Sequence, residues 1–339
     1  MMISVRELYP RAFRTVLSRL ALVGCVVVIT AQAVGQEQNP PPSPTSTLKI
    51  SINVVNVYAV VRDKKRHLIP NLNKDDFMLE EEKQPQTVLY FSRETDTPLT
   101  LGMLVDTSPS QQRVLSLERE EGAAFLRQVL RPKDLAFVIH FDAEVELLQD
   151  FTADLHLLAH ALDETQINGG GRGPLPGPFP TSDAPCCTDL YDAVYLASNE
   201  LMKNEIGRKV LILLTDGEDE GSKVKLDTAL AAAQRSDVII YSIDISDRMF
   251  YRTAGMGYSG DSVLKKLSEE TGGRVIHVGR PGDTATAFQQ IAEELRTQYL
   301  LGYTSTNDKR DGSFRRIHVQ VRNEDYRVQA RRGYYSPLD

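Results

Sequence analysis

The sequence predicts an α/β protein: a doubly wound, mostly parallel sheet, flanked by a small β domain built from N- and C-terminal segments. Apolar strands alternate with amphipathic helical segments between residues 99 and 297, which is typical of a parallel sheet with helices on both faces. Strand-like alternation occurs before and after that region, at residues 50–61 and 317–336. A chain of 339 residues is long enough for both parts.

Residues 1–33 are expected to form a secretory signal peptide, cleaved after Ala33 or nearby. Arginines precede the apolar run 20-LALVGCVVVITA-31, and 31-AQA-33 has the small residues of a cleavage site. The run is shorter than the roughly 20 apolar residues of a membrane span. A retained anchor and lipid attachment at Cys25 are the alternatives. We therefore expect a secreted, periplasmic or cell-envelope protein.

Residues 34–47 are rich in proline, serine and glutamine and predict an extended linker. Residues 48–97 predict an N-terminal β unit, because strand-like alternation runs through 50–61 and a later strand is expected at 87-TVLYFS-92. The C-terminal segment 306–339 has the same pattern. We expect it to pair with residues 48–97, so that both form one discontinuous domain beside the α/β region, residues 98–305.

The α/β region is expected to contain alternating strands and helices. The expected strands are 99–106, 134–142, 145–150, 209–216, 238–245 and 274–279. The expected helices are 113–130, 154–164, 189–203, 223–235, 261–271 and 284–297. Because the strands are apolar on both faces, they belong to a buried sheet covered on both sides.

Two of the expected strands end in an aspartate. The first ends at Asp106, with Ser108 and Ser110 following at alternate positions, and another ends at Asp216 within 215-TDG-217. In an open doubly wound sheet, ligands bind at the carboxyl ends of strands where the strand order reverses. Two carboxylates and two hydroxyls converging there suit a hard cation such as Mg²⁺, with Mn²⁺ or Ca²⁺ as alternatives.

These motifs resemble the metal-ion-dependent adhesion site of a von Willebrand factor type A domain, over roughly residues 97–305. The matching pieces are Asp106-x-Ser108-x-Ser110, the threonine of 188-TDLYDAV-194, and 215-TDG-217. The flanking segments 75–86 and 298–321 resemble a bacterial secreted subgroup, the VWFA-related proteins.

The resemblance implies a set of metal ligands and a mode of binding. The implied ligands are Asp106, Ser108, Ser110, Thr188 and Asp216. The serines and the threonine would bind the metal directly, and the aspartates largely through water. A coordination position would then remain for an Asp or Glu carboxylate of a protein partner.

Several features of the three motif segments depart from the family pattern or allow another interpretation. Pro109 stands between the serines, and Cys186 and Cys187 precede Thr188, so Thr181 and Ser182 compete for the threonine's role. The serines could instead cap the helix expected at 113–130, since serine is a favoured N-cap. Asp142, Asp219 and Asp244 also lie near strand ends. We expect Asp219 to be at most in a supporting position and not a ligand.

Other patterns argue against nucleic acid and small-molecule cofactors. The net charge is −7 and no basic stripe is present. The pattern 255-GMGYSG-260 begins too far after a strand for a dinucleotide turn. The glycines at 169–173 lack the Gly-Lys-Ser/Thr of a phosphate loop, and His156 and His160 lack the glutamate of a zinc-protease helix.

We therefore expect a non-enzymatic, secreted module for cation-dependent protein–protein binding, either in adhesion or in complex assembly. A metal-dependent hydrolase and a structural envelope component with a vestigial metal site are the alternatives. The hydrolase is disfavoured because no general base has the spacing of known metal hydrolases. A single Mg²⁺ held by hydroxyls is also a weaker activator of water than zinc.

Overall fold

The computed structural model describes residues 54–93, 97–167, 188–245, 259–279 and 283–338. The expected signal peptide and linker lie outside these residues, as do Thr181, Ser182, Cys186 and Cys187. Among the described residues, none of the helices has both the length and the apolar character needed to cross a membrane.

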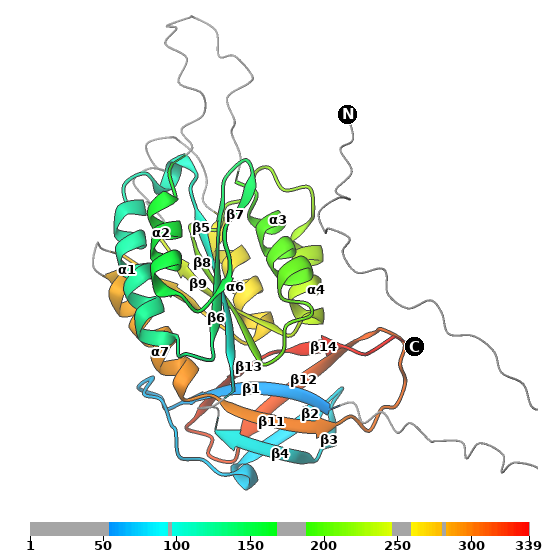
Figure 1. Ribbon diagram of the computed structural model, residues 1–339. Helices are drawn as coiled ribbons and strands as arrows, with labels where there is room; N and C mark the ends of the chain where they lie inside the picture. Colours follow the sequence, from blue (N-terminus) through cyan, green and yellow to red (C-terminus); the bar gives the residue numbers. More distant parts are fainter. Residues whose placement is uncertain (1–53, 94–96, 168–187, 246–258, 280–282, 339) are drawn as a thin grey trace, which may run out of the picture. The chain divides into compact units, whose positions relative to one another are not determined.

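The α/β part is built on a sheet that has six strands within the described residues, in the order β10-β9-β8-β5-β6-β7 (Figure 1). The strands are β5 Leu99–Asp106, β6 Leu135–Phe141, β7 Val145–Thr152, β8 Arg208–Thr215, β9 Val238–Asp244 and β10 Val275–His277. Neighbours pair in parallel from β10 to β6, whereas the edge strand β7 is antiparallel. The predicted doubly wound, mostly parallel sheet is confirmed.

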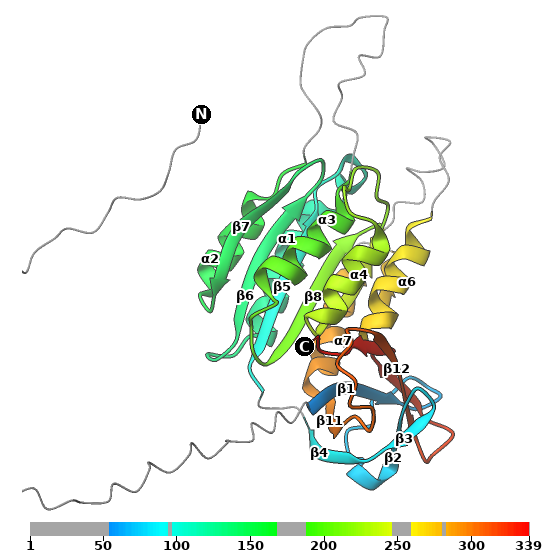
Figure 2. The ribbon, with the colours of Figure 1, turned by 90° about the vertical axis from the view of Figure 1, so that its right-hand side faces the viewer.

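Helices cover both faces of this sheet (Figures 1 and 2). One face carries α1 Leu115–Val129, α2 Leu155–Glu164 and α7 Asp283–Arg296. The other carries α3 Leu190–Leu196, α4 Leu226–Arg235 and α6 Gly260–Thr271. Strands β5 and β8 are buried at every position because helices lie on both sides of them. This is the fold that the resemblance to type A domains implies.

The order of the strands fixes where a site can form. Strand β5 lies between β6 and β8, so the chain turns to one side of β5 first and to the other side later. The carboxyl ends of β5 and β8 therefore flank the point of reversal, where open sheets of this kind bind their ligands.

The flanking β part contains two four-stranded sheets in the described residues, with the orders β13-β1-β11-β4 and β14-β12-β2-β3. Their strands are β1 Val54–Arg62, β2 Phe77–Glu81, β3 Gln84–Gln86, β4 Val88–Arg93, β11 Tyr299–Thr304, β12 Phe314–Val321, β13 Arg327–Ala330 and β14 Gly333–Tyr335. The C-terminal strands pair with N-terminal ones: β12 with β2, and β13 with β1. Apolar side chains from both sheets share one core.

One predicted boundary is wrong. The α/β region was expected to extend to residue 305, but β11 pairs with β1 and β4 in the β part. Tyr299, Leu301 and Tyr303 are buried in the core between the two β sheets. An apolar strand that follows a helix has the same local pattern in either domain, so the sequence could not assign it.

The β part contacts the amino-terminal edge of the parallel sheet. Arg331 pairs with Asp237, which directly precedes β9, and Arg62 lies 2.5 Å from the carboxylate of Glu294 in α7. Arg332 lies 2.5 Å from Glu269 near the end of α6. These contacts are at the edge opposite to the carboxyl ends of β5 and β8.

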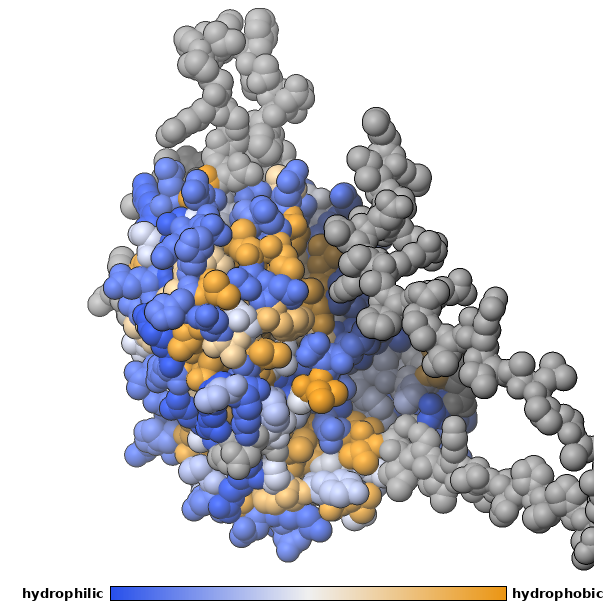
Figure 3. Space-filling view, in the orientation of Figure 1, coloured by the Kyte–Doolittle hydropathy of each residue, from blue (hydrophilic) through white to orange (hydrophobic). Residues whose placement is uncertain are grey.

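Much of the surface seen in Figure 3 is polar, but apolar side chains gather near the edge strand β7. Leu147 of β7 and Leu157 of α2 are both exposed. The antiparallel edge strand is therefore less well covered than β5 and β8, which are the strands that position the candidate site.

Candidate metal centre

Strands β5 and β8 bring Asp106 and Asp216 to the same edge of the sheet. The strands pair in parallel up to Val105 and Leu214, so Asp106 lies beside Thr215 and Asp216 follows directly. Both aspartates are buried. The hydroxyl of Thr215 donates to Oδ2 of Asp106 at 2.6 Å, which fixes the orientation of that carboxyl group.

The two serines lie beside Asp106 in the loop after β5. The backbone N–H of Ser108 donates to Oδ1 of Asp106 at 2.9 Å, and the hydroxyl oxygens of Ser108 and Ser110 are 3.0 Å apart. Pro109 begins a short 3-10 turn, Pro109–Gln111, where its fixed φ is favourable. The loop therefore presents the two hydroxyls as a pair.

The helix-cap interpretation of these serines is wrong. Ser108 precedes only the 3-10 turn, and its side chain makes no capping hydrogen bond. The N-cap of α1 is Val114, four residues after Ser110. The hydroxyl groups are thus not used to start α1.

Thr188 lies at the same sheet edge, between the loop after β6 and the loop after β8. Its carbonyl accepts a hydrogen bond from the N–H of Glu220 at 3.1 Å, and the N–H of Asp189 donates to the carbonyl of Asp142 at 2.7 Å. Asp142 also accepts a hydrogen bond from Thr107, the residue after Asp106. Thr188 is therefore packed among the loops that surround the aspartates, and its role as a ligand stays a prediction.

Gln111 is a part of the site that the sequence did not reveal. Its side chain is fully buried, and its amide donates to Oδ2 of Asp216 at 3.0 Å and to the hydroxyl of Ser110 at 3.3 Å. Its own Oε1 is buried and accepts no hydrogen bond within the described residues. Gln111 thus links the serine loop to the second aspartate.

Glu118, on the first turn of α1, is the second residue that was missed. It is 1% exposed, and both its carboxyl oxygens are buried with no hydrogen-bond partner in the described part of the chain. It occupies the buried stripe of α1 together with Leu115, Gly122 and Phe125. A charged residue within an apolar helix stripe is the sequence signal that could have identified it.

Three acidic side chains are therefore crowded in one buried region. Burial, and then the neighbouring Asp216, raise the pKa of Asp106 to about 7. Burial, followed by Asp106 and Asp216, raises the pKa of Glu118 well above its ordinary value. Both shifts arise because a buried region solvates negative charge poorly and like charges repel one another.

The residues present fit a hard divalent cation. Carboxyl and hydroxyl oxygens are the donors that Mg²⁺, Mn²⁺ and Ca²⁺ prefer. The unpartnered oxygens of Gln111 and Glu118 are further acceptor atoms in the same buried region as Asp106 and Asp216. A positive charge among these groups would offset the repulsion that raises the pKa of Asp106.

The loop after β8 is fixed by close backbone packing against α6. Gly217 has φ of 83°, and a Cβ added to Gly260 would lie 2.0 Å from the carbonyl oxygen of Asp216. Glu218 accepts a hydrogen bond from the N–H of Gly260 at 2.9 Å, at the start of α6. The glycine of the 215-TDG-217 motif is required by this geometry.

Asp219 links two segments near the candidate site, and its supporting role stays a prediction. Its carboxylate accepts hydrogen bonds from the N–H of Tyr191 and from the hydroxyl of Ser222. It therefore joins the start of α3 to the loop after β8. α3 begins two residues after Thr188, so Asp219 fixes the segment that follows that threonine.

No protein-family model matches the chain. A protein of Borreliella burgdorferi described as uncharacterized is 23% identical over 242 residues, which cover 66% of this chain and 62% of that protein. The match therefore spans less than two thirds of the length of that protein.

Several solved structures are similar to this chain. BatB from Bacteroides thetaiotaomicron is 15% identical, with a TM-score of 0.42, over 58% of this chain and 97% of that chain. The vWF domain of the type V pili tip protein Mfa5 from Porphyromonas gingivalis is 12% identical, with a TM-score of 0.41, over 58% of this chain and 94% of that chain. Proximal thread matrix protein 1 from the mussel byssus, with a zinc-occupied MIDAS motif, is 15% identical, with a TM-score of 0.46. The match covers 64% of this chain and 50% of that chain.

Proposed function

We propose that this chain is a secreted, type A-like binding protein that captures a protein partner through a divalent cation. The ligands in this proposal are Asp106, Ser108, Ser110, Thr188 and Asp216. The observation that carries it is the meeting of buried, mutually repelling carboxyl groups with a pair of serine hydroxyls at one sheet edge. Adhesion and complex assembly are the two settings in which such binding would serve.

The protein's own groups prepare the site. Thr215 orients Asp106, while Gln111 orients Asp216 and contacts Ser110, so the donor atoms are held by partners behind them. Such outer contacts fix the ligand geometry of metal sites. We propose Mg²⁺ as the physiological ion because every donor is an oxygen, with Mn²⁺ or Ca²⁺ as alternatives.

The partner is proposed to offer an Asp or Glu carboxylate. Neutral hydroxyl donors from the serines and the threonine would leave a bound cation with much of its positive charge, and the cation would supply a coordination position for that carboxylate. The contact would be charge-assisted and directional. The site lies at the sheet edge opposite to the contacts of the β part, so the β part does not cover it.

The test is capture of partners from a cell-surface extract by the full chain, in Mg²⁺ and in EDTA. We expect capture in Mg²⁺ only, and its loss in Asp106→Ala and Ser108→Ala. Ser262→Ala removes an exposed hydroxyl from α6 and is the matched control for Ser108→Ala. Circular dichroism checks that each variant is folded.

Three outcomes would contradict the proposal. Capture that survives both EDTA and the two site variants would show that binding does not use the cation. A folded chain whose thermal unfolding is unchanged by Mg²⁺, Mn²⁺ or Ca²⁺ would favour a vestigial site. Turnover of a substrate that requires Mg²⁺ and Asp106 would favour the hydrolase instead.

A further inference from the structure

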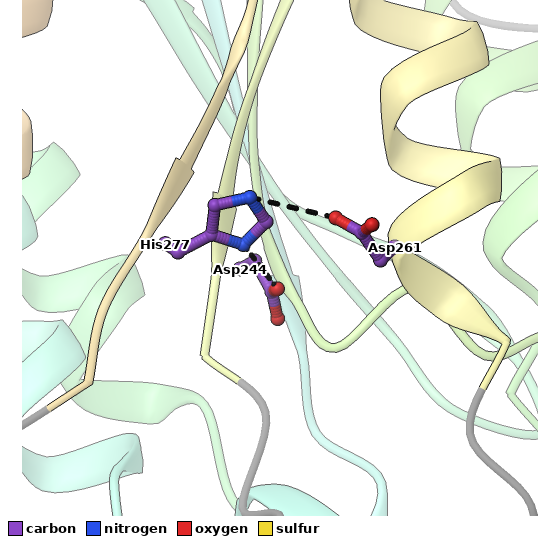
Figure 4. A group of neighbouring side chains, drawn as sticks. All are labelled: Asp244, Asp261 and His277. Atoms are coloured by element: carbon purple, nitrogen blue, oxygen red, sulfur yellow. Dashed lines mark hydrogen bonds and ion pairs between the residues drawn. The ribbon is translucent and has the colours of Figure 1, made fainter.

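A second group of metal-binding side chains lies at the same sheet edge, beyond β8. Asp244 and His277 are the last residues of β9 and β10 and are paired in register. Asp261 is the second residue of α6. Figure 4 shows the imidazole between the two carboxylates, and one donor atom from each of the three residues lies within 4.8 Å of the others.

Asp244 determines the state of the imidazole. Its Oδ2 lies 2.7 Å from Nδ1 of His277, and Asp244 is buried. An ionised carboxylate can only accept a hydrogen bond, so Nδ1 must carry the proton. In the neutral ring Nε2 then has a free lone pair, which is the arrangement of a metal-binding histidine oriented by a carboxylate.

Nε2 of His277 faces Asp261. The distance from Nε2 to Oδ1 of Asp261 is 3.4 Å (Figure 4). That oxygen is buried and accepts no hydrogen bond from the described residues. The other oxygen, Oδ2, accepts a hydrogen bond from Lys265 at 2.7 Å, which fixes the direction in which Oδ1 points.

The separation of these two atoms matches a pair of ligands on one metal ion. Zinc–nitrogen and zinc–oxygen bonds are about 2.0–2.2 Å long, so two ligands of a tetrahedral zinc stand about 3.3–3.6 Å apart. The observed 3.4 Å lies within that range. A direct hydrogen bond between the two groups would be shorter and would need a proton on Nε2.

We propose that His277 and Asp261 form a second cation site, which binds zinc or a similar transition metal, with Asp244 and Lys265 as positioning residues. The nitrogen–oxygen donor pair separates this site from the all-oxygen site at Asp106, because imidazole favours zinc over magnesium. A metal held there would connect the start of α6 to the end of β10. Water or a donor from a binding partner would complete its coordination.

The competing account is an ion pair in which a doubly protonated His277 is held between the two carboxylates. In that account both ring nitrogens donate, and no metal is needed. The two accounts differ in what zinc does, because an imidazolium has no lone pair to offer.

The test is a calorimetric titration of the full chain with Zn²⁺ at pH 7.5, in excess Mg²⁺ so that the first site is filled. Co²⁺ absorption in parallel reports whether a nitrogen ligand is present in a tetrahedral geometry. We expect one Zn²⁺ site that is lost in His277→Gln and in Asp261→Asn. His277 is partly exposed, so its replacement leaves the core intact.

Asp244→Asn separates a positioning role from a ligand role. Loss of an outer carboxylate is expected to weaken Zn²⁺ binding by about 10–100-fold without abolishing it. His160→Gln, on the exposed face of α2, controls for binding by surface histidines. Asp106→Ala controls for zinc at the first site. Both control variants should bind Zn²⁺ as the unmodified chain does.

Zn²⁺ binding that is absent in the unmodified chain, or unchanged in His277→Gln, would overturn the proposal. The proposal also fails if Asp106→Ala abolishes the signal while His277→Gln keeps it, since the zinc would then occupy the first site. The Mg²⁺-dependent capture of a partner is measured separately, with Asp106→Ala as its failing variant. Failure of either proposal therefore leaves the other testable.

Discussion

Two buried glutamates, one in each part of the molecule, have opposite surroundings. Glu81, in the β part, is 2% exposed and accepts hydrogen bonds from the hydroxyls of Tyr303 at 2.7 Å and Ser305 at 2.6 Å. Tyr334 and Arg315 complete its partners. Glu118, in the α/β part, is equally buried, but it accepts no hydrogen bond within the described residues and faces two aspartates.

The difference separates a buried carboxyl group whose partners all belong to the chain from one that has no hydrogen-bond partner in the described residues. A buried carboxylate with partners on both oxygens belongs to a network that is complete within the chain. A buried carboxylate that faces other carboxyl groups costs stability unless something outside the chain neutralises it. We therefore expect the stability of the α/β part, and not that of the β part, to respond to a cation.

Glu81→Ala should have the largest effect on stability. Arg315 would lose its buried carboxylate and the tyrosine hydroxyls their acceptor, and breaking such a pair costs about 3–5 kcal/mol. Urea unfolding measures the loss, which should be the same in Mg²⁺ and in EDTA. Glu120→Ala, on the exposed side of α1, is the control, and a loss below about 1 kcal/mol for Glu81→Ala would contradict the comparison.

The free energy of unfolding of the metal-free chain should depend on pH because of the buried carboxyl groups in the α/β part. The pKa of Asp106 rises from 3.8 to about 7 on folding, so between these values the unfolded chain releases a proton that the folded chain keeps. The free energy of unfolding in EDTA should therefore fall as pH rises from about 4 to about 7, by up to about 1.4 kcal/mol per pH unit.

Urea unfolding at pH 5, 6 and 7 checks this slope. Excess Mg²⁺ should flatten it, because a cation favours the ionised carboxyls. Asp106→Asn removes the titrating group and isolates its contribution from that of Glu118, whose pKa is also raised. A slope in EDTA that is the same with and without Asp106 would show that this residue is not the cause.

Glu118→Gln should have opposite effects on stability and on binding. Glutamine removes a buried carboxyl group that folding must desolvate and hold protonated, so the metal-free chain is expected to become more stable by about 1–3 kcal/mol, while Mg²⁺ affinity falls. Glu81→Gln is the matched variant and should destabilise the chain without changing Mg²⁺ affinity. Thermal unfolding measures the stability of each variant, and calorimetry measures its Mg²⁺ affinity. If Glu118→Gln and Glu81→Gln changed the stability in the same direction, the contrast between the two glutamates would be contradicted.

Thr188→Val should have the smallest effect on the fold while still weakening the binding of the cation. Valine keeps the shape but removes the hydroxyl, so Mg²⁺ affinity is expected to fall by up to about tenfold, or about 1.4 kcal/mol. The free energy of unfolding in EDTA should change little. Thr228→Val, at an exposed position of α4, is the control. Unchanged Mg²⁺ binding would remove Thr188 from the ligand set.

The sequence predicted the elements of the sheet and the meeting of Asp106 with Asp216, because both follow from local patterns. A uniformly apolar strand is buried, and parallel strands end at the same edge. The sequence could not assign Tyr299–Thr304 to the β part, since an apolar strand after a helix fits either domain.

Glu118 and Gln111 were missed for a different reason. The sequence shows that α1 has a buried stripe, but the packing of α1 on the sheet decides that this stripe faces the two aspartates. The meeting of His277 with Asp261 depends in the same way on how α6 lies beside β10.

Sequence patterns were enough to predict the fold class, the strand ends that carry Asp106 and Asp216, and the paired serines of the loop after β5. Periodicity and strand-end position are local properties, so they can be read from neighbouring residues. The packing of the elements determines which polar atoms are buried without a hydrogen-bond partner in the described residues, as are both carboxyl oxygens of Glu118 and Oδ1 of Asp261. Burial and the lack of a partner depend on distant segments packing together, and no local pattern contains that information.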